Sequence, residues 1–223
     1  MRDEREAALA RESPPPNDRR RTRGDLRATL ARHLREKLAH LSTKLAGAPT
    51  GDRQAHHPTV YDTVTALPNR AHLRRRLYQE LPALLVAGRP LSLLCLGLDG
   101  LKRFDEVHGR TASEESLRIV AARVRHALRA HDVVARVGED RFVCLMPDTA
   151  DAERLRLIAH RLLDAVSAPM RIGSIEFDVS AHLGVAIAPH DARAADELLA
   201  SADAAMYRAM RHRCGLAFYG QPL

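Results

Sequence analysis

The sequence predicts an α/β protein, in the broad sense that includes α+β, with a mixed central β-sheet flanked by helices and an N-terminal helical arm. Segments with helical periodicity alternate with short apolar runs, which favours helices packed on a sheet. Two of these runs flank a charged turn, RVGEDRF, and this pattern predicts a central hairpin. Apolar residues make up 45% of the chain and aromatic residues 4%, so we expect a core of Leu, Val, Ala and Ile.

The N-terminal region is predicted to form three successive segments. Residues 1–23 combine Pro and Arg clusters with little apolar content, and we expect disorder there. Between Asp25 and Gly47 a leucine stripe predicts an amphipathic helix over residues 24–47. The stripe comprises Leu26, Leu30, Leu34, Leu38, Leu41 and Leu45. This stripe would pack either on the domain or on a second chain as a coiled coil, and residues 48–60 are a predicted linker.

The formal charge of +7 is concentrated in the N-terminal arm. Residues 1–60 hold 13 Lys and Arg against 8 Asp and Glu, whereas the rest of the chain holds 22 against 20. Without interleaved aromatic residues or a docking motif, we interpret the arm as solubilising and expect no nucleic-acid partner. The sequence has no secretory leader, no apolar run of about 20 residues and no paired cysteines, so it predicts a cytoplasmic protein with no transmembrane segment.

The domain is predicted over residues 61–220, beginning with a helix over Arg70–Leu84. The following run RPLSLLCLGLDG, residues 89–100, is nearly continuous in apolar residues, as in a strand covered on both faces. A long amphipathic helix is expected over Ser113–Ala130, and Asp132–Pro147 contains the two strands of the hairpin. The inward residues of that helix are predicted to be Leu117, Ile119, Val120, Val124 and Leu128.

The second half of the domain supplies two more helices and two more strands. A helix over Ala152–Ala165 precedes a strand over Ile175–Ile187, in which Gly184 is a candidate irregularity. A last helix over Ala194–Arg213 and a short strand over Leu216–Tyr219 complete the alternation of helices and strands.

Five local motifs occur in an order and spacing that resemble the GGDEF family, the diguanylate cyclases that join two GTP molecules into cyclic di-GMP. They are DTVTALPNR (62–70), LDGLKRFDEVHG (98–109), RAHDVVARVGEDRF (129–142), SAHLGVAI (180–187) and SADAAMYRAMR (201–211). The resemblance covers about residues 60–220. It implies a bacterial signalling protein with a nucleotidyl cyclase or polymerase palm-like fold, in which the hairpin presents its signature turn to a metal-bound triphosphate.

The same resemblance places the two carboxylate ligands of magnesium at Gly97 and Asp140, so one of them is missing. Asp99 is the candidate substitute, because a side chain two residues along a strand points the same way. The alternative interpretation makes Asp99 a capping residue of the following turn. Asp140 is thus a remnant metal ligand, and magnesium is expected only if residual cyclase activity persists.

The signature turn keeps its first glycine, Gly138, but departs from the family at the next and fourth positions. Glu139 replaces a glycine and adds bulk and negative charge where a substrate phosphate would approach. Arg141 replaces an acidic residue, is expected to pair with Asp140 or Glu139, and would compete with a bound cation.

The family's nucleotide contacts are also altered. The resemblance maps guanine recognition to Asp105, in place of Asn, and to Glu114, in place of Asp. Lys102 is retained, whereas the two basic residues that grip the triphosphate map to Met210 and Cys214. This pattern indicates a maintained scaffold with a degenerate active site.

A second family site is better preserved. Arg129 and Asp132 form an RxxD motif, followed by five residues before Gly138, as in the product-binding inhibitory site of the family. Arginine offers a planar fork to phosphate and guanine acceptors, and the carboxylate accepts from a guanine edge. Arg161 is a candidate additional arginine of this site. The alternative role for Asp132 is to end the helix and start the strand.

Three functions remain open from the sequence. The first is a catalytically inactive receptor or regulator that binds cyclic di-GMP through Arg129 and Asp132. The second is a weakly active diguanylate cyclase that uses Asp140, Asp99 and Lys102. The third is an interaction module that binds no nucleotide and works through the helix of Leu26–Leu45, with a protein partner or a second copy of the chain.

Overall fold

A five-stranded sheet forms the centre of the protein in the computed structural model, which describes residues 60–222. The predicted arm, its helix and most of the linker, residues 1–59, lie outside the described residues. The strands are β1 (Leu91–Asp99), β2 (Val133–Arg136), β3 (Arg141–Pro147), β6 (Ser180–Ala188) and β7 (Leu216–Phe218). Their spatial order is β2-β3-β1-β6-β7, with β7 parallel to β6 and the other pairs antiparallel. The mixed sheet flanked by helices is therefore confirmed.

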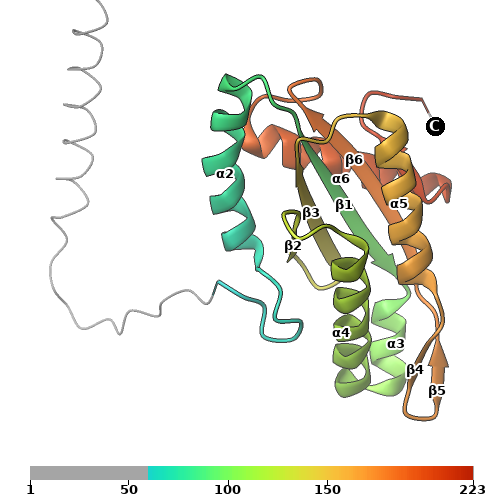
Figure 1. Ribbon diagram of the computed structural model, residues 1–223. Helices are drawn as coiled ribbons and strands as arrows, with labels where there is room; N and C mark the ends of the chain where they lie inside the picture. The colour runs from blue at the N-terminus through green and yellow to red at the C-terminus, as the bar shows by residue number, and fades with distance from the viewer. Residues whose placement is uncertain (1–59, 223) are drawn as a thin grey trace, which may run out of the picture. The chain divides into compact units, whose positions relative to one another are not determined.

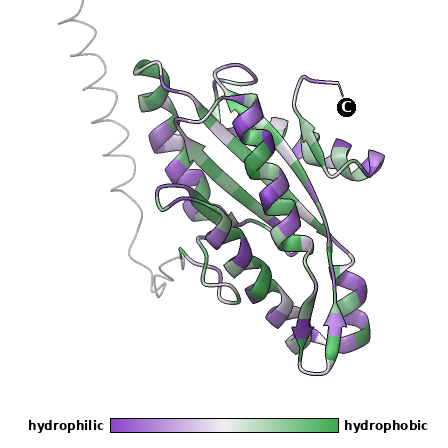
Figure 2. Cartoon of the chain, turned by 45° about the vertical axis from the view of Figure 1, so that its right-hand side comes forward, coloured by the Kyte–Doolittle hydropathy of each residue, from purple (hydrophilic) through white to green (hydrophobic). Residues whose placement is uncertain are grey.

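Within residues 60–222 the helices around the sheet are α2 (Arg70–Val86), α3 (Leu101–His108), α4 (Arg110–Ala127), α5 (Ala152–Ser167) and α6 (Ala195–His212). Figure 1 shows α4 and α5 on one face of the sheet and α6 on the other. α2 packs against β2 and α6, at the edge of the sheet. Figure 2 shows the apolar strands enclosed by helices whose outer faces are hydrophilic. Within residues 60–222, no helix has the length and apolar character needed to cross a membrane.

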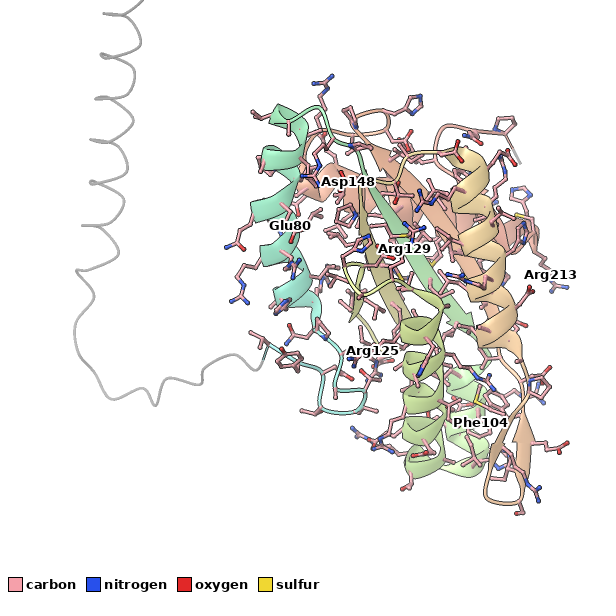
Figure 3. All side chains as sticks on the ribbon, viewed as in Figure 1. Glu80, Phe104, Arg125, Arg129, Asp148 and Arg213 are labelled. Carbon is pink, nitrogen blue, oxygen red and sulfur yellow. The ribbon has the colours of Figure 1, made fainter. Side chains whose placement is uncertain are left out.

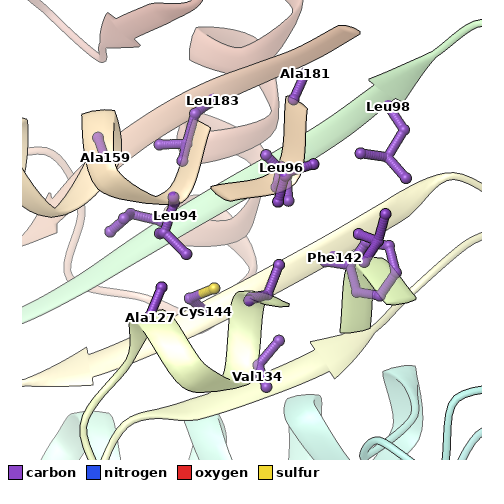
Figure 4. Packing of buried hydrophobic residues seen from close by; sticks show 14 of the residues in the cluster. Leu94, Leu96, Leu98, Ala127, Val134, Phe142, Cys144, Ala159, Ala181 and Leu183 are labelled. Carbon is purple, nitrogen blue, oxygen red and sulfur yellow. The ribbon is translucent and has the colours of Figure 1, made fainter. Parts of the chain in front are cut away.

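The central strand β1 separates two hydrophobic cores, because successive side chains of a strand point to opposite faces. Leu94, Leu96 and Leu98 pack with Phe142 and the helices α4 and α5 (Figure 4). On the other face, Leu93 and Cys95 pack with side chains of α2 and α6. Burial on both faces explains the nearly continuous apolar run that predicts this strand.

Gly184 of β6 marks a close approach of a helix, and the strand is regular there. A Cβ atom at this position would lie 2.0 Å from the backbone nitrogen of Met206 and 2.3 Å from the carbonyl oxygen of Ala202. The candidate irregularity at Gly184 is thus wrong. The glycine instead lets α6 lie directly on the sheet.

Two elements differ from the sequence prediction. α3 was not predicted, and α4 spans Arg110–Ala127 where the sequence predicted a helix over Ser113–Ala130; Gly109, with φ +81°, separates α3 from α4. The strand predicted over Ile175–Ile187 is two strands, and its first part, β5 (Ile175–Phe177), pairs with β4 (Met170–Ile172) in a separate hairpin. Phe177 stacks on Phe104 of α3 with ring centroids 3.9 Å apart, which directs this hairpin away from the main sheet.

Candidate functional site

The signature turn connects β2 to β3, and the side chain of Arg136 binds its backbone. One guanidinium nitrogen of Arg136 donates to the carbonyl oxygen of Glu139 at 2.8 Å, and another lies 3.2 Å from both carboxylate oxygens of Asp62. Asp62 also accepts hydrogen bonds from the backbone nitrogen and hydroxyl of Thr65 at 2.8 and 2.6 Å. Burial alone would raise the pKa of Asp62, but the hydrogen bonds from Thr65 and Arg136 outweigh it and lower that pKa. The turn is therefore tied to the loop that precedes α2.

Gly97 is the position to which the resemblance assigns the first metal carboxylate. In the sheet register it lies between Arg141 of β3 and His182 of β6, so all three positions face α6. A Cβ atom at Gly97 would lie 2.5 Å from the sulfur of Met206. The thioether of α6 thus fills the space, and a carboxylate there would require Met206 to move.

Arg141 places its guanidinium on α6 beside this position. Its Nη1 donates to Asp203 at 2.8 Å, its Nη2 donates to the hydroxyl of Tyr207, and its guanidinium carbon lies 4.8 Å from the centre of the Tyr207 ring. Burial would lower the pKa of Arg141, but Tyr207 and Asp203 raise it above its usual value. The predicted partner Asp140 lies 4.0 Å from Nε, and within residues 60–222 no ion pair joins Arg141 to the side chain of Glu139. The main partner of Arg141 is therefore Asp203, which the sequence analysis missed.

The remaining acidic residues do not assemble a metal site. Asp140 has a half-exposed side chain on the turn, with 52% of its surface accessible. Asp99 accepts a hydrogen bond from the backbone nitrogen of the adjacent Gly100 at 2.8 Å, and no side chain caps α3, which follows. No group of three His, Cys, Asp or Glu side chains within residues 60–222 is arranged to hold a metal ion. With a glycine, a thioether and a guanidinium at its centre, this site does not fit magnesium.

The residues expected to contact a nucleotide are spread over three helices. Lys102 and Asp105 are exposed on α3. Glu114 of α4 accepts from Nε of Arg110 at 2.9 Å and lies 3.5 Å from a guanidinium nitrogen of Arg118, so its charge is already paired. Met210 and Cys214 lie at the end of α6, where neither side chain carries the positive charge that would grip a triphosphate.

The RxxD motif lies in the loop between α4 and β2 (Figure 3). Asp132 Oδ2 accepts a hydrogen bond from the backbone nitrogen of Arg129 at 3.0 Å, as expected of a residue that ends a helix. Its side chain is only 1% exposed, and Oδ1 is buried without a hydrogen-bond partner in the described chain. The imidazole nitrogen Nε2 of His131 lies 3.7 Å from this oxygen. A buried carboxylate oxygen without a donor costs free energy and is unusual in a folded protein.

Two cavities meet at this motif. One of about 800 Å³ extends toward α2 and is lined by Arg129, Asp132, Tyr61, Arg76 and Arg125, among others. The other, of about 310 Å³, lies between the end of α4 and α5.

Arg129 and Asp132 line this smaller cavity together with Arg154, Leu157 and Arg161. Arg161 also donates a hydrogen bond to the carbonyl oxygen of Ala127, so its guanidinium is partly occupied. The structure thus brings the three predicted residues of this site together. The sequence analysis missed Arg154, although it lies seven residues before Arg161 and hence on the same helix face.

Comparisons with known proteins match the fold described above. The family model described as "Diguanylate cyclase, GGDEF domain" matches residues 59–214. The bifunctional diguanylate cyclase and cyclic di-GMP phosphodiesterase MucR of Pseudomonas aeruginosa is 34% identical over 193 residues, which cover 86% of this chain and 28% of MucR. The chain therefore spans less than a third of that protein's length.

Solved structures of the same kind superpose on the chain. The GGDEF domain of TpbB from Pseudomonas aeruginosa is 32% identical, has a TM-score of 0.68, and the match covers 71% of this chain and 94% of that domain. The GGDEF domain of DgcB from Caulobacter crescentus, solved in complex with cyclic di-GMP, has a TM-score of 0.67 at 20% identity and covers 78% of this chain and all of that domain. The latter shows the fold alone.

Proposed function

The chain belongs to the GGDEF-domain family of diguanylate cyclases, and on that premise we propose that it is a catalytically inactive receptor or regulator of cyclic di-GMP signalling. We propose that it acts in the bacterial cytoplasm and binds cyclic di-GMP through Arg129 and Asp132, with Arg161 as an additional ligand. GGDEF cyclases generally use magnesium. In our proposal this chain requires none.

The observation that carries the proposed inactivity is the position of the Arg141 guanidinium. Arg141 of β3 pairs with Gly97 on the neighbouring strand β1, and its guanidinium is bound by Asp203 and Tyr207 of α6. A dication within about 4 Å of this group would meet a repulsion on the order of 8 kcal/mol at an effective dielectric constant of 20. Asp203, which is already paired with Arg141, and the more distant Asp140 would offset only part of this repulsion. Two magnesium ions, as nucleotide condensation needs, are not compatible with this charge distribution.

The proposed ligand site is supported by the two unused groups of the RxxD motif. The Arg129 side chain is exposed beside both cavities, and Asp132 Oδ1 is buried without a donor. A guanine edge carries two N–H donors next to a carbonyl acceptor, and it would satisfy the carboxylate and the guanidinium together. Binding would thereby remove the cost of the unpaired oxygen.

Calorimetric titration of the full chain with cyclic di-GMP tests this site directly. We expect saturable binding by the wild type and an affinity roughly tenfold to a hundredfold weaker for Arg129→Ala, because a charge-assisted contact is lost. Arg103→Ala, an exposed arginine of α3 remote from both cavities, is the matched control and should bind like the wild type. An absence of binding by the wild type would leave the interaction module as the remaining interpretation.

A cyclase assay tests the proposed inactivity separately. Purified protein incubated with GTP and magnesium should form no cyclic di-GMP above background. Production at the rate of an ordinary cyclase would show that Asp140, Asp99 and Lys102 suffice for the reaction, and would contradict the role we give to Gly97 and Arg141. A homodimer formed through the helix of Leu26–Leu45 is a further proposal. It predicts that the full chain has twice the monomer mass in solution, whereas a chain beginning at residue 56 has the monomer mass.

A further inference from the structure

A separate cavity of about 320 Å³ lies on the α6 face of the sheet, between α2, α6 and β3. Val137 and Arg141, which flank the signature turn, form one of its walls. It shares no lining residue with the two cavities at the RxxD motif. Neither the family resemblance nor the proposed function assigns a role to it.

Two similar clusters of charge form the rim of this cavity. Arg74 of α2 lies 2.9 Å from Asp196, which also accepts a hydrogen bond from the hydroxyl of Tyr78. In the second cluster, Arg141 pairs with Asp203 and donates a hydrogen bond to the hydroxyl of Tyr207. The two aspartates are seven residues apart on α6, which places them on one face of the helix two turns apart. Each aspartate therefore balances one arginine.

Arg70 adds a third guanidinium to the rim, and nothing balances it. It is the first residue of α2 and is exposed, and no hydrogen bond or ion pair joins its side chain to any residue of the described chain. The rim thus carries three arginines against two aspartates. The resulting excess of one positive charge favours an anion.

The floor of the cavity is apolar and uncharged. Leu73, Val143 and Leu199 line it, together with the buried thiol of Cys95. Burial, with a further contribution from Asp203, raises the pKa of Cys95 to about 12, so the thiol stays protonated at neutral pH. An apolar surface below a single uncompensated cation is the arrangement that binds an amphipathic anion.

We propose that this cavity binds a small amphipathic anion, a carboxylate or phosphate monoester, with its charged group on Arg70 and its apolar body on Leu73 and Val143. The inference does not depend on cyclic di-GMP binding at the RxxD motif. Because Val137 and Arg141 belong to the wall, an occupant would contact both ends of the signature turn. The cavity is thereby a site at which a metabolite would influence the turn.

The test uses phenyl phosphate and benzoate as probes and follows the backbone amide signals of the full chain by nuclear magnetic resonance. We expect saturable shifts at Val137, Gly138 and Ala200. Arg70→Ala should weaken the affinity about tenfold, as expected for the loss of one charge-assisted contact at an exposed site. Binding of both probes supports an anion site of broad preference, whereas binding of one identifies its anion as phosphate or carboxylate.

Two further variants separate the cavity from a general effect of charge. Arg75→Ala removes an exposed arginine of the same helix that does not line the cavity, and should leave the affinity unchanged. Ala200→Leu fills the cavity from an exposed position of α6 and should abolish the shifts. The proposal is overturned if neither probe saturates, if both variants at the cavity behave like the wild type, or if the shifts gather around Arg129. A failure of cyclic di-GMP to bind would leave this result unaffected.

Discussion

The signature turn and the RxxD loop are both rich in charge, but they use it differently. At the signature turn the charged groups bind one another: Arg141 is held by Asp203 and Tyr207, and Arg136 is paired with Asp62. At the RxxD loop the Arg129 guanidinium is exposed and one oxygen of Asp132 has no donor in the described chain. Charges that are already paired stabilise the fold, whereas unpaired charges are available to a ligand. This difference is why we assign binding to the loop and not to the turn.

The largest expected effect tests whether cyclic di-GMP binding at the RxxD loop requires the close packing of α6 on the sheet. In Gly184→Ala the new Cβ atom would clash with the backbone of α6, so we expect a loss of about 3 kcal/mol or more in the free energy of unfolding, measured with urea. Cyclic di-GMP binding should fall with the folded fraction. In Gly138→Ala the nearest atom lies 3.5 Å away, so this variant is the control and should change stability by less than about 0.5 kcal/mol. Equal stability of the two variants would contradict the close packing of α6.

The next effect concerns the unpaired oxygen of the loop. Asp132→Asn can keep the hydrogen bond from the Arg129 backbone but presents an amide donor where the carboxylate oxygen lay. We expect cyclic di-GMP affinity to fall at least tenfold in calorimetry, with stability within about 1 kcal/mol of the wild type. Asp151 caps α5 by accepting a hydrogen bond from the backbone nitrogen of Arg154 at 2.7 Å. The control variant Asp151→Asn should bind cyclic di-GMP like the wild type. Unchanged affinity of Asp132→Asn would place the ligand elsewhere.

A smaller effect is expected at the paired charges of the turn. Asp203→Asn weakens the ion pair with Arg141, whose side chain is 31% exposed, so we expect a loss of about 0.5 to 1 kcal/mol in urea unfolding. Cyclic di-GMP affinity should not change. Asp196→Asn is the control for a more exposed aspartate of the same helix, with 62% accessibility, and should cost less. If Asp203→Asn impaired binding, the two regions would not be independent.

A last effect, of similar size, is a dependence of stability on pH at Asp62. Its pKa is lower in the folded protein than its ordinary value, so its contribution to stability is present above about pH 4 and is lost as pH falls through the lowered pKa. The stability difference between wild type and Asp62→Asn, about 1 kcal/mol at pH 7, should therefore shrink below pH 4. Urea unfolding between about pH 2 and 7 measures it. A difference that grew on acidification would contradict the assigned direction.

Local patterns predicted most of the sheet and the helices, because burial on one or both faces leaves a periodic signal. The apolar run ending at Leu98 and the leucines of α2 are examples. The predictions missed α3, which a positive φ at Gly109 separates from α4, and they joined β5 to β6, although Phe177 of β5 packs on the distant Phe104. Neither cause is visible in a local pattern.

The candidate sites show the same division. Arg129 and Asp132 are three residues apart, so the motif itself places them together, and Arg161, expected from the family resemblance, lines the same cavity. The partner of Arg141 lies 62 residues away on α6, and nothing near Arg141 in the sequence indicates Asp203. The thioether of Met206 beside Gly97 is likewise a contact between distant elements.

The ion pair between Asp62 and Arg136 has a mechanical consequence. Asp62 lies two residues after the start of the described chain, whereas Arg136 holds the turn through the carbonyl of Glu139. The backbone nitrogen of Arg136 also donates to Pro68 in the same loop at 2.9 Å. A force that displaces residues 60–69 must either break these contacts or drag the tip of the hairpin with it. A displacement of residues 60–69 would therefore be transmitted through Arg136 to the signature turn.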